Sequence, residues 1–157
     1  MARDVDLSRR QEMLLLLISK ADDPGLDPVR IMKGQFLLAM ETPEDWMESD
    51  ARYEFVPYNY GPYSSEIYRD LATLERIGLI SGTALRGRSW RYYVSTGRGT
   101  RFAKNVSSNL SPDLVNYVGQ ILAFICSLSF TELLRAIYHK YPAFAVNSVF
   151  ASPEQSG

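Results

Sequence analysis

The spacing of apolar residues changes once along this chain, at Gly78, from a helical period to an alternating one. Before Gly78, apolar positions recur at helical spacing over roughly 8–21, from Asp27 through Met40, and from Ser64 to about Ile77. Each segment opens with a serine or an aspartate, whose side chain can accept a hydrogen bond from an early backbone N–H of a helix. We therefore expect three helices in the first half of the chain.

After Gly78, apolar and polar residues alternate, which is typical of strands. Residues 79–85 and 90–94 are predicted to form two strands, with RGRS at 86–89 as the turn between them. Three helices followed by a hairpin is the order of a winged helix-turn-helix domain, in which the third helix enters the DNA major groove and the hairpin is the wing. We predict this fold for residues 1–106.

The segment between the second and third predicted helices is first acidic and then rich in tyrosine. Thr42-Pro43 is a helix-start signal, so a short acidic helical turn is expected over 43–49. YEFVPYNYGPY at 53–63 is expected to be extended or irregular, because proline disfavours helix at the residue before it. Its tyrosines around Gly61-Pro62 are interpreted as packing residues that set the angle of the third helix, and a contact with a partner is left open.

Helix signals return after the hairpin. Residues 96–108 are expected to form a further helix or loop, Ser111-Pro112 starts a long apolar helix, and a capping box at Ser129–Glu132 starts another that runs to about Lys140. We assign residues 107–150 to this C-terminal helical pair and expect residues 151–157 to be disordered. The predicted fold class is mainly α with a small β-hairpin: a winged helix-turn-helix core plus a C-terminal helical pair.

The long apolar helix favours a homodimer. Nearly every residue between Leu114 and Leu128 is apolar, and a helix that is apolar all round must be buried on more than one side. Either the winged core covers it completely or a second subunit helps to cover it. We expect a homodimer, because pairing also doubles the contacts to a palindromic DNA site.

Length and composition indicate one soluble domain, or one domain with a helical appendage, since 46% of the 157 residues are hydrophobic and 22% are charged. The single cysteine, Cys126, cannot form an internal disulfide, which is typical of a reducing cytoplasm. The run MLLLLI at 13–18 lacks the basic leader and the cleavage site of an export signal. The longest apolar stretch, 114–130, suits a buried helix better than a membrane span. We expect a cytoplasmic protein without membrane contact.

Charge is distributed unevenly although the net charge is only −1. Seven of the 17 Lys and Arg residues lie between Arg76 and Pro112, where no Asp or Glu occurs. Such a strip can attract a polyanion, because the local field governs the encounter, and arginine binds phosphate through paired hydrogen bonds. We predict a regulator that binds double-stranded DNA through a basic wing. Its candidate DNA-binding residues are Arg69, Thr73 and Arg76 on the third helix, Arg86, Arg88 and Arg91 in the wing, and Arg98 and Arg101 after it.

Acidic residues argue the other way. The third helix also carries Glu66, Asp70 and Glu75. With Arg69 and Arg76 included, its net charge is −1, so the wing is expected to supply most of the attraction to DNA. The window 41–54 holds six carboxylates against Arg52 alone. It can repel DNA on its side, dock a basic partner, or be a solvated loop. The alternative function is therefore an antitoxin-like or adaptor protein-interaction module that does not bind DNA.

Catalysis finds little support in the sequence, and no cofactor, metal site or catalytic residue is predicted. The only histidine, His139, lies near a helix end, where it more often interacts with terminal carbonyls than acts as a base. Cys126 lies in an apolar run with no nearby basic residue, so inert packing is expected. No cysteine–histidine set fits zinc, and GRGT at 97–100 lacks the lysine spacing of a phosphate-binding loop and is interpreted as a turn.

Several motifs together resemble a known family. They are VRIMKGQFLLAM at 29–40, the aromatic and proline-rich stretch after it, YGPYS at 60–64, LERIGLI at 74–80 and YHKYP at 138–142. This combination, over residues 10–145, resembles the Panacea or SocA-like group, small bacterial and phage proteins with a winged-helix-like core. Some members act as antitoxins or proteolytic adaptors. The resemblance implies a non-enzymatic regulator that works through contacts with DNA or with a toxin-like protein, and it leaves that choice open.

Overall fold

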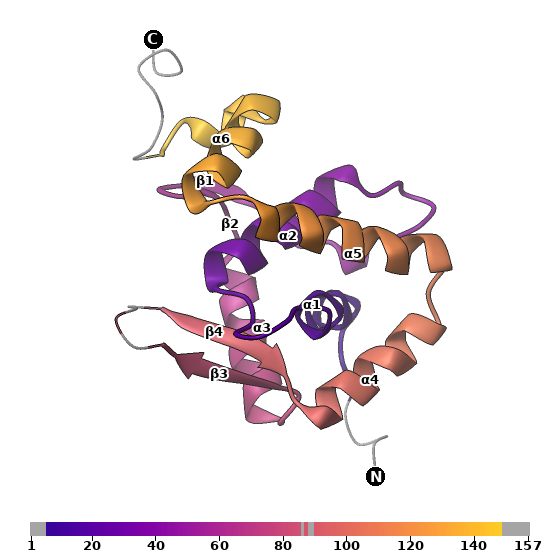
Figure 1. Cartoon of the computed structure of the whole chain (residues 1–157). Coiled ribbons are helices and arrows are strands. Elements are labelled where there is room, and N and C mark those ends of the chain that lie inside the picture. Colours follow the sequence, from indigo (N-terminus) through magenta and orange to yellow (C-terminus); the bar gives the residue numbers. More distant parts are fainter. Residues whose placement is uncertain (1–5, 86, 88–89, 149–157) are drawn as a thin grey trace.

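The computed structural model describes residues 6–85, 87 and 90–148, and within them the chain is mainly helical with two small antiparallel β-hairpins (Figure 1). The α-helices are α1 (Arg9–Ser19), α2 (Pro28–Glu41), α3 (Ser65–Arg76), α4 (Gly97–Ser108), α5 (Pro112–Ser127) and α6 (Phe130–Lys140). Strands β1 (Val56–Tyr58) and β2 (Gly61–Tyr63) form one hairpin, and β3 (Ile80–Ala84) and β4 (Arg91–Ser95) form the other. Two short 3-10 turns are η2 (Ser49–Ala51) and η3 (Pro142–Ala145).

Helix α1 is the central element of the fold. Every side chain from Met13 to Ile18 is at most 3% exposed, so this helix is buried on all sides. Figure 1 looks along α1 and shows α2, α3, α4 and α5 arranged around it. The leucine run that lacked the features of an export signal is therefore the middle of the hydrophobic core.

The predicted helix starts are confirmed at most positions. Ser8 and Gln11 form the expected capping box, as do Ser129 and Glu132, and the carboxylate of Asp27 accepts a hydrogen bond from the backbone of α2. Ser64 occupies the N-cap position of α3 but makes no side-chain cap bond, so that part of the prediction was wrong. Its backbone N–H is directed at the sulfur of Met32 instead, 3.3 Å away.

The tyrosine-rich segment forms a β-hairpin, where the sequence predicted an extended or irregular segment. Val56 pairs with Tyr63, and Tyr58 with Gly61, around a two-residue turn. The prolines permit this because Pro57 and Pro62 face each other, at a position where neither backbone nitrogen has to donate across the hairpin. Gly61 has φ of +91°, a conformation that side chains disfavour.

The acidic turn predicted over 43–49 is a single hydrogen-bonded turn and not a regular helix: the backbone N–H of Trp46 donates to the carbonyl oxygen of Pro43 at 3.1 Å, and the short η2 turn follows. The loop is held by the guanidinium group of Arg52, which donates hydrogen bonds to the carbonyl oxygens of Ala39, Pro43 and Met47. These bonds satisfy backbone groups that a helix would have satisfied internally.

The predicted hairpin after Gly78 is confirmed as β3 and β4, and a third segment lies beside it. Leu26 and Tyr93 exchange two backbone hydrogen bonds of 2.9 Å each, which places the loop between α1 and α2 along the free side of β4. The turn residues Arg86, Arg88 and Ser89 lie outside the described residues.

The glycine-rich stretch 97–100, predicted to be a turn, is the first turn of α4. Thr96 caps it by accepting a hydrogen bond from the backbone of Gly99 at 3.0 Å. Gly99 is needed there because a Cβ atom would lie only 1.8 Å from the carbonyl oxygen of Leu79. The predicted boundary between residues 106 and 107 falls inside this helix, and the predicted tail 151–157 lies outside the described residues.

Helix α5 is covered on one side only. Leu114, Val118, Ile121 and Ile125 are buried, whereas Phe124 is 42% exposed. The core of a single chain therefore does not cover this helix completely, and the homodimer stays a prediction. Among the described residues, no helix is both long and apolar enough to cross a membrane.

The contact between α1 and α2 at Leu17 and Gly34 can be tested with a double-mutant cycle. A Cβ atom on Gly34 of α2 would lie 2.8 Å from Cδ2 of the buried Leu17. We expect Leu17→Ala to lower the free energy of unfolding by about 2–5 kcal/mol, because it leaves a cavity. Gly34→Ala is expected to cost about 1–3 kcal/mol through overpacking. In the double variant the new methyl group fills part of the cavity, so urea unfolding should show a smaller loss than the sum. Strict additivity would contradict this packing.

Candidate functional site

The outer face of α3 carries a polar stripe, beside which lies Glu66, whose side chain is 37% exposed. Arg69 and Arg76 are exposed and Thr73 is half-buried, and their spacing of four and three residues puts them on one side of the helix. The structure therefore brings together the three α3 residues that the sequence predicted for DNA contact. Sequence reasoning missed the neighbours that complete this face at the same helical spacing: Ser65, Tyr68 and Ala72.

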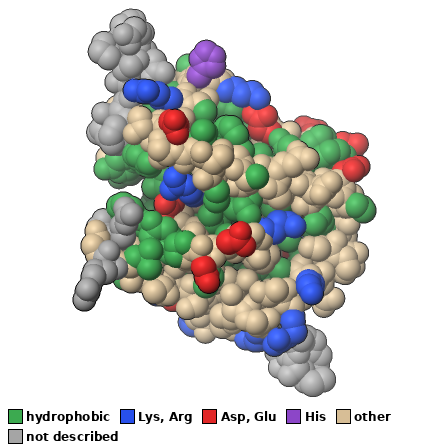
Figure 2. Space-filling view, in the orientation of Figure 1, with side chains coloured by type: hydrophobic (Ala, Val, Ile, Leu, Met, Phe, Trp, Pro, Cys, Tyr) green, Lys and Arg blue, Asp and Glu red, His purple; other side chains and the backbone are tan. Residues whose placement is uncertain are grey.

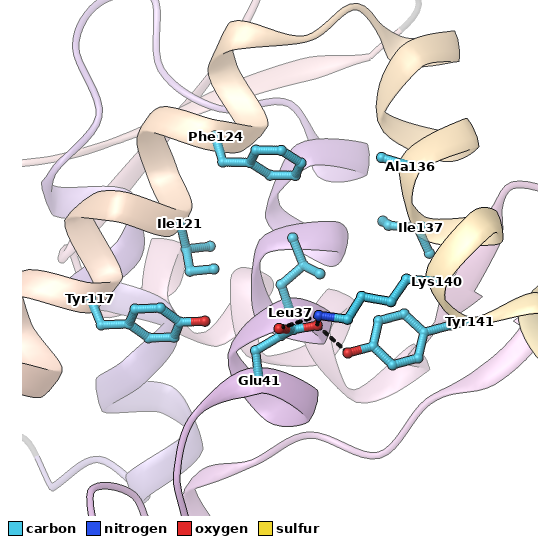
Figure 3. Close-up of a pocket in the computed structure, with 9 residues that line it drawn as sticks. All are labelled: Leu37, Glu41, Tyr117, Ile121, Phe124, Ala136, Ile137, Lys140 and Tyr141. Carbon is cyan, nitrogen blue, oxygen red and sulfur yellow. Dashed lines mark hydrogen bonds and ion pairs between the residues drawn. The ribbon is translucent and has the colours of Figure 1, made fainter.

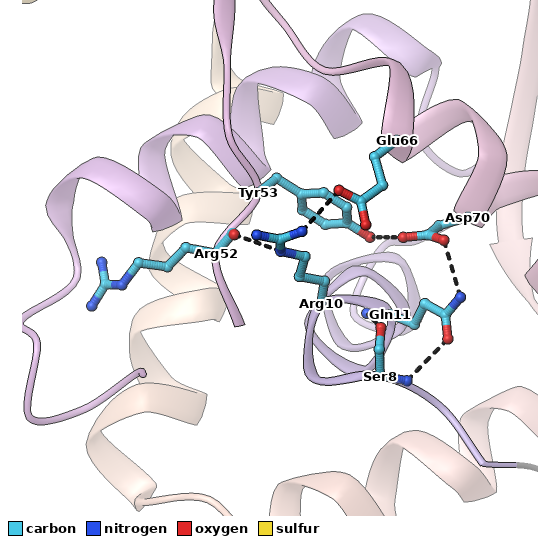
Figure 4. A network of polar contacts seen from close by, with 7 residues as sticks. All are labelled: Ser8, Arg10, Gln11, Arg52, Tyr53, Glu66 and Asp70. Atoms are coloured by element: carbon cyan, nitrogen blue, oxygen red, sulfur yellow. Dashed lines mark hydrogen bonds and ion pairs between the residues drawn. The ribbon is translucent and has the colours of Figure 1, made fainter. Parts of the chain in front are cut away.

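Two of the three α3 carboxylates turn toward α1 and Tyr53 (Figure 4). Glu66 accepts a hydrogen bond of 2.9 Å from the guanidinium group of Arg10. Asp70 is only 8% exposed and accepts hydrogen bonds from the hydroxyl of Tyr53 at 2.7 Å and from the amide of Gln11 at 3.0 Å. Burial and the hydrogen bond to Asp70 hold the pKa of Tyr53 above its usual value, so its hydroxyl keeps its proton and remains a donor.

Glu75, the third carboxylate, pairs with Arg91 of β4. Two hydrogen bonds of 3.1 and 2.7 Å join the carboxylate to the guanidinium group, and Glu75 also accepts from the backbone of Gly82. Arg91 donates further to the carbonyl oxygen of Gly82 at 2.7 Å. From the sequence alone, Glu75 argued against DNA binding and Arg91 argued for it. In the structure the two side chains form an ion pair, so their charges offset each other.

A second group of cations lies on α4. The guanidinium group of Arg98 donates a hydrogen bond to the carbonyl oxygen of Ile77, so it covers the C-terminal end of α3, where the helix dipole attracts a positive charge. Arg101 and Lys104 follow on the same helix and are exposed. Figure 2 shows Lys and Arg side chains along the lower edge of the molecule, where α4 lies in Figure 1. Arg86 and Arg88, the remaining candidates, lie outside the described residues.

Exposed carboxylates gather in a different place, on the loop between α2 and β1. We call this the acidic loop and define it by its exposed acidic residues Glu44, Asp45, Glu48, Asp50 and Glu54. Figure 2 shows Asp and Glu side chains at the upper right, where this loop lies in Figure 1. The cations of α4 and the acidic loop thus lie in different parts of the surface, and Arg9 of α1 pairs with Glu48 of the loop at 3.7 Å.

A buried lysine lies beneath the tyrosine hairpin β1–β2. Lys33 of α2 is 3% exposed, and its Nζ donates a hydrogen bond of 3.2 Å to the carbonyl oxygen of Pro62. Burial lowers the pKa of Lys33 from 10.5 to about 7, although the negative charge of Asp27 partly opposes this change. The sequence carried one signal for this residue that was not used: a single cation inside the apolar run IMKGQFLLAM at 31–40.

An apolar cavity of about 200 Å³ lies between α2, α5 and α6 (Figure 3). At its edge, Glu41 of α2 accepts hydrogen bonds from Lys140, at 2.8 Å, and from Tyr141. Burial alone would raise the pKa of Glu41, but these two hydrogen bonds outweigh it and hold the pKa below its usual value. The contacts join the C-terminal helices to α2.

Two residues weighed for catalysis are placed at the surface. His139 is exposed in the last turn of α6. Cys126 is exposed rather than packed, and Arg30 lies near it, both of which correct the sequence analysis. Partial burial still raises the pKa of its thiol, which disfavours the reactive thiolate. Within the described ranges, no three His, Cys, Asp or Glu residues are close enough together to hold a metal ion.

Comparison with known proteins adds no relative: no protein-family model matches the chain, and no curated protein is significantly similar to it. The resemblance to the Panacea or SocA-like group therefore stays a prediction.

Lys33 generates a pH-dependent stability prediction. Because its pKa is lower in the folded chain than the 10.5 of an unperturbed lysine, the unfolded chain binds more protons between about pH 7 and pH 10.5. Burial of the protonated Lys33 lowers the free energy of unfolding by its full amount below pH 7. This loss of stability disappears as the pH rises through this window. Lys33→Met should therefore raise the free energy of unfolding at pH 7, by roughly 4 kcal/mol at most.

Urea unfolding of the native chain and the Lys33→Met variant between pH 6 and pH 10 checks this expectation. The difference in stability should shrink toward the alkaline end. Lys104→Met, which removes an exposed lysine, is the matched control and should show no such trend. A Lys33→Met advantage that is independent of pH would contradict the low pKa.

Proposed function

We propose that this chain is a non-catalytic regulator that binds double-stranded DNA, with the outer face of α3 in the major groove and the cations of α4 on the phosphates. The observation that carries the proposal is the engagement of all three α3 carboxylates by Arg10, Tyr53 and Arg91. Without them, Arg69 and Arg76 are the charged groups that α3 presents outward. A face of this kind can approach phosphates and base edges without repulsion from its own helix.

The surroundings of α3 support a winged helix-turn-helix arrangement. The hairpin β3–β4 follows α3 directly, and Glu75 and Arg91 tie the two together. Leu26, between α1 and α2, pairs with Tyr93 and adds a third segment to this small sheet. The hairpin is thereby held beside the helix that is proposed to read DNA, as a wing requires.

The electrostatic attraction is assigned to two helices. Arg69 and Arg76 belong to α3, and Arg98, Arg101 and Lys104 belong to α4. Arg98 reaches the end of α3, so the two groups adjoin. Binding of this type releases counterions and weakens steeply with salt. A homodimer, with the half-covered α5 as its contact, is part of the proposal, and sedimentation of the intact chain tests it.

The first test removes the α3 cations. Arg69→Ala and Arg76→Ala should each weaken binding to a random-sequence duplex and reduce the slope of log affinity against log salt by about 1, as expected for a lost phosphate contact. Fluorescence anisotropy of a labelled duplex at several salt concentrations measures both quantities. Arg135→Ala, an exposed arginine on α6, is the control and should leave the slope unchanged. No retention of duplex by the native chain at low salt would overturn the proposal.

The second test frees the guanidinium group of Arg91 from its ion pair with Glu75. Glu75→Gln removes the partner of Arg91, whose side chain is 48% exposed, and should make its guanidinium group available to phosphate. We expect several-fold tighter duplex binding and a salt slope steeper by about 1. Glu44→Gln changes the net charge equally on the acidic loop and should have a smaller effect. Equal effects of the two substitutions would show that net charge alone governs binding.

A protein-interaction role without DNA binding is the second candidate, and the exposed carboxylates of the acidic loop favour it. A partner of basic character, such as a toxin-like protein, would be bound there through complementary charge. If this is the function, the tagged chain should retain a stoichiometric partner when purified from its own cells. A variant with the five loop carboxylates changed to amides should lose that partner. Retention by this variant would count against the loop.

A further inference from the structure

The cavity around Lys33 has the features of a small-molecule site. Its volume is about 190 Å³, and it opens between α2 and the tyrosine hairpin. Apart from Lys33, the residues that line it are apolar or aromatic, and no carboxylate is among them. A buried ammonium group therefore faces a cavity that contains no opposite charge. The lining residues used below are Met32, Tyr58, Tyr60, Tyr63 and Tyr68.

The ammonium group of Lys33 has unused hydrogen-bonding capacity. It has three N–H donors, and within the described part of the chain its one hydrogen bond goes to the carbonyl oxygen of Pro62. Asp27 lies close enough to influence it, but both carboxylate oxygens of Asp27 already accept from Arg30, at 2.7 and 2.9 Å. A buried charge without an ion-pair partner is costly, and a bound anion would remove that cost.

The walls of the cavity favour a planar ring. The rings of Tyr58 and Tyr63 lie 4.7 Å apart with an angle of 35° between their planes, and those of Tyr63 and Tyr68 lie 6.0 Å apart at 38°. Tyr58, Tyr60 and Tyr68 are each about half exposed, so ring surface remains available at the rim. Stacked or edge-to-face aromatic contacts add stability beyond that of the buried area.

A larger cavity of about 780 Å³ adjoins the first and shares Tyr60 and Tyr68 with it. It is lined further by Trp90, Tyr92 and Phe130, and also by Asp27 and Arg30, which form an ion pair with each other at 2.9 Å. The two cavities therefore adjoin at Tyr60 and Tyr68, and Lys33 lines the smaller one.

We infer that this site binds a small aromatic carboxylate, with the acid group paired to the ammonium of Lys33 and the ring packed against the tyrosines. A carboxylate accepts charge-assisted hydrogen bonds from a lysine, and these are stronger in a buried site than in water. The tyrosine hydroxyl groups can orient polar substituents on the ring. Binding is non-covalent, and because the pKa of Lys33 is about 7, pairing with the carboxylate is accompanied by proton uptake near neutral pH.

Occupancy of the site would also regulate DNA binding, a consequence that rests on the proposed function. Tyr68 lines both cavities and belongs to the outer face of α3. A ligand packed on Tyr68 would therefore occupy the N-terminal end of the face that is proposed to enter the groove. We expect the ligand to weaken duplex binding.

The ligand-binding test contains no DNA, so its failure and that of the proposed function are distinguishable. Isothermal titration calorimetry of the full chain uses 4-hydroxybenzoate as the probe and 4-hydroxybenzamide, which has the same shape without the charge, as its comparison. We expect the acid to bind the native chain at least about tenfold more tightly than the amide, as a charge-assisted bond requires. In Lys33→Met, which we expect to fold stably, this preference should disappear. In Lys20→Met, which removes a lysine that lines neither cavity, it should persist.

Several results would overturn the inference. These are no measurable binding of the acid, equal binding of acid and amide, or an acid preference that survives in Lys33→Met. A capped peptide that presents the same aromatic acid tests the other source of this chemistry. If it binds more tightly than the free acid, the site belongs to a protein partner and the assignment to a small molecule is wrong.

Discussion

The fold depends on one constraint: α1 must be covered on every side. Six consecutive apolar side chains, from Met13 to Ile18, lie at its centre, and leaving any of them in water would cost about 1.5–3 kcal/mol. No single neighbouring helix can cover such a surface. α2, α3, α4 and α5 therefore surround it. The orientation of α3, on which the proposed function rests, follows from this arrangement.

The rotation of α3 about its own axis follows from its buried apolar stripe, Ile67, Leu71 and Leu74, together with polar contacts from α1. Arg10 and Gln11, in the first turn of α1, reach Glu66 and Asp70 respectively. Such partly buried polar contacts contribute less to stability than to the choice of one orientation, because a wrong rotation would leave charges without partners. The same contacts leave Arg69 and Arg76 on the outside. The stabilising network and the proposed DNA-binding face are thus two sides of one helix.

Lys33 shows the opposite relation between stability and function. A buried ammonium group beneath a tyrosine hairpin destabilises the fold, and a methionine of similar length would fit an apolar cavity better. Natural chains tend to break local rules where function requires it. The hairpin β1–β2 has a structural role as well, since it leads directly into α3, and its Pro62 carbonyl group is the acceptor for Lys33. One segment therefore joins the inferred ligand site to the proposed DNA-binding helix.

The sequence by itself determined five of the six helices of the described residues and the hairpin β3–β4, because these follow from local periodicity and from capping residues such as Ser8, Asp27 and Ser129, whereas the local pattern over α4 permits a helix or a loop. It also placed Arg69, Thr73 and Arg76 on one helical face. Only the tertiary structure decided which charges are available. Glu75 and Arg91 are far apart in the chain, and so are Asp70 and Tyr53, and no local pattern shows that they meet. The hairpin β1–β2 was missed for a related reason. Pro57 and Pro62 fit into it only because they lie opposite each other, and this register is a property of the paired strands and not of either strand alone.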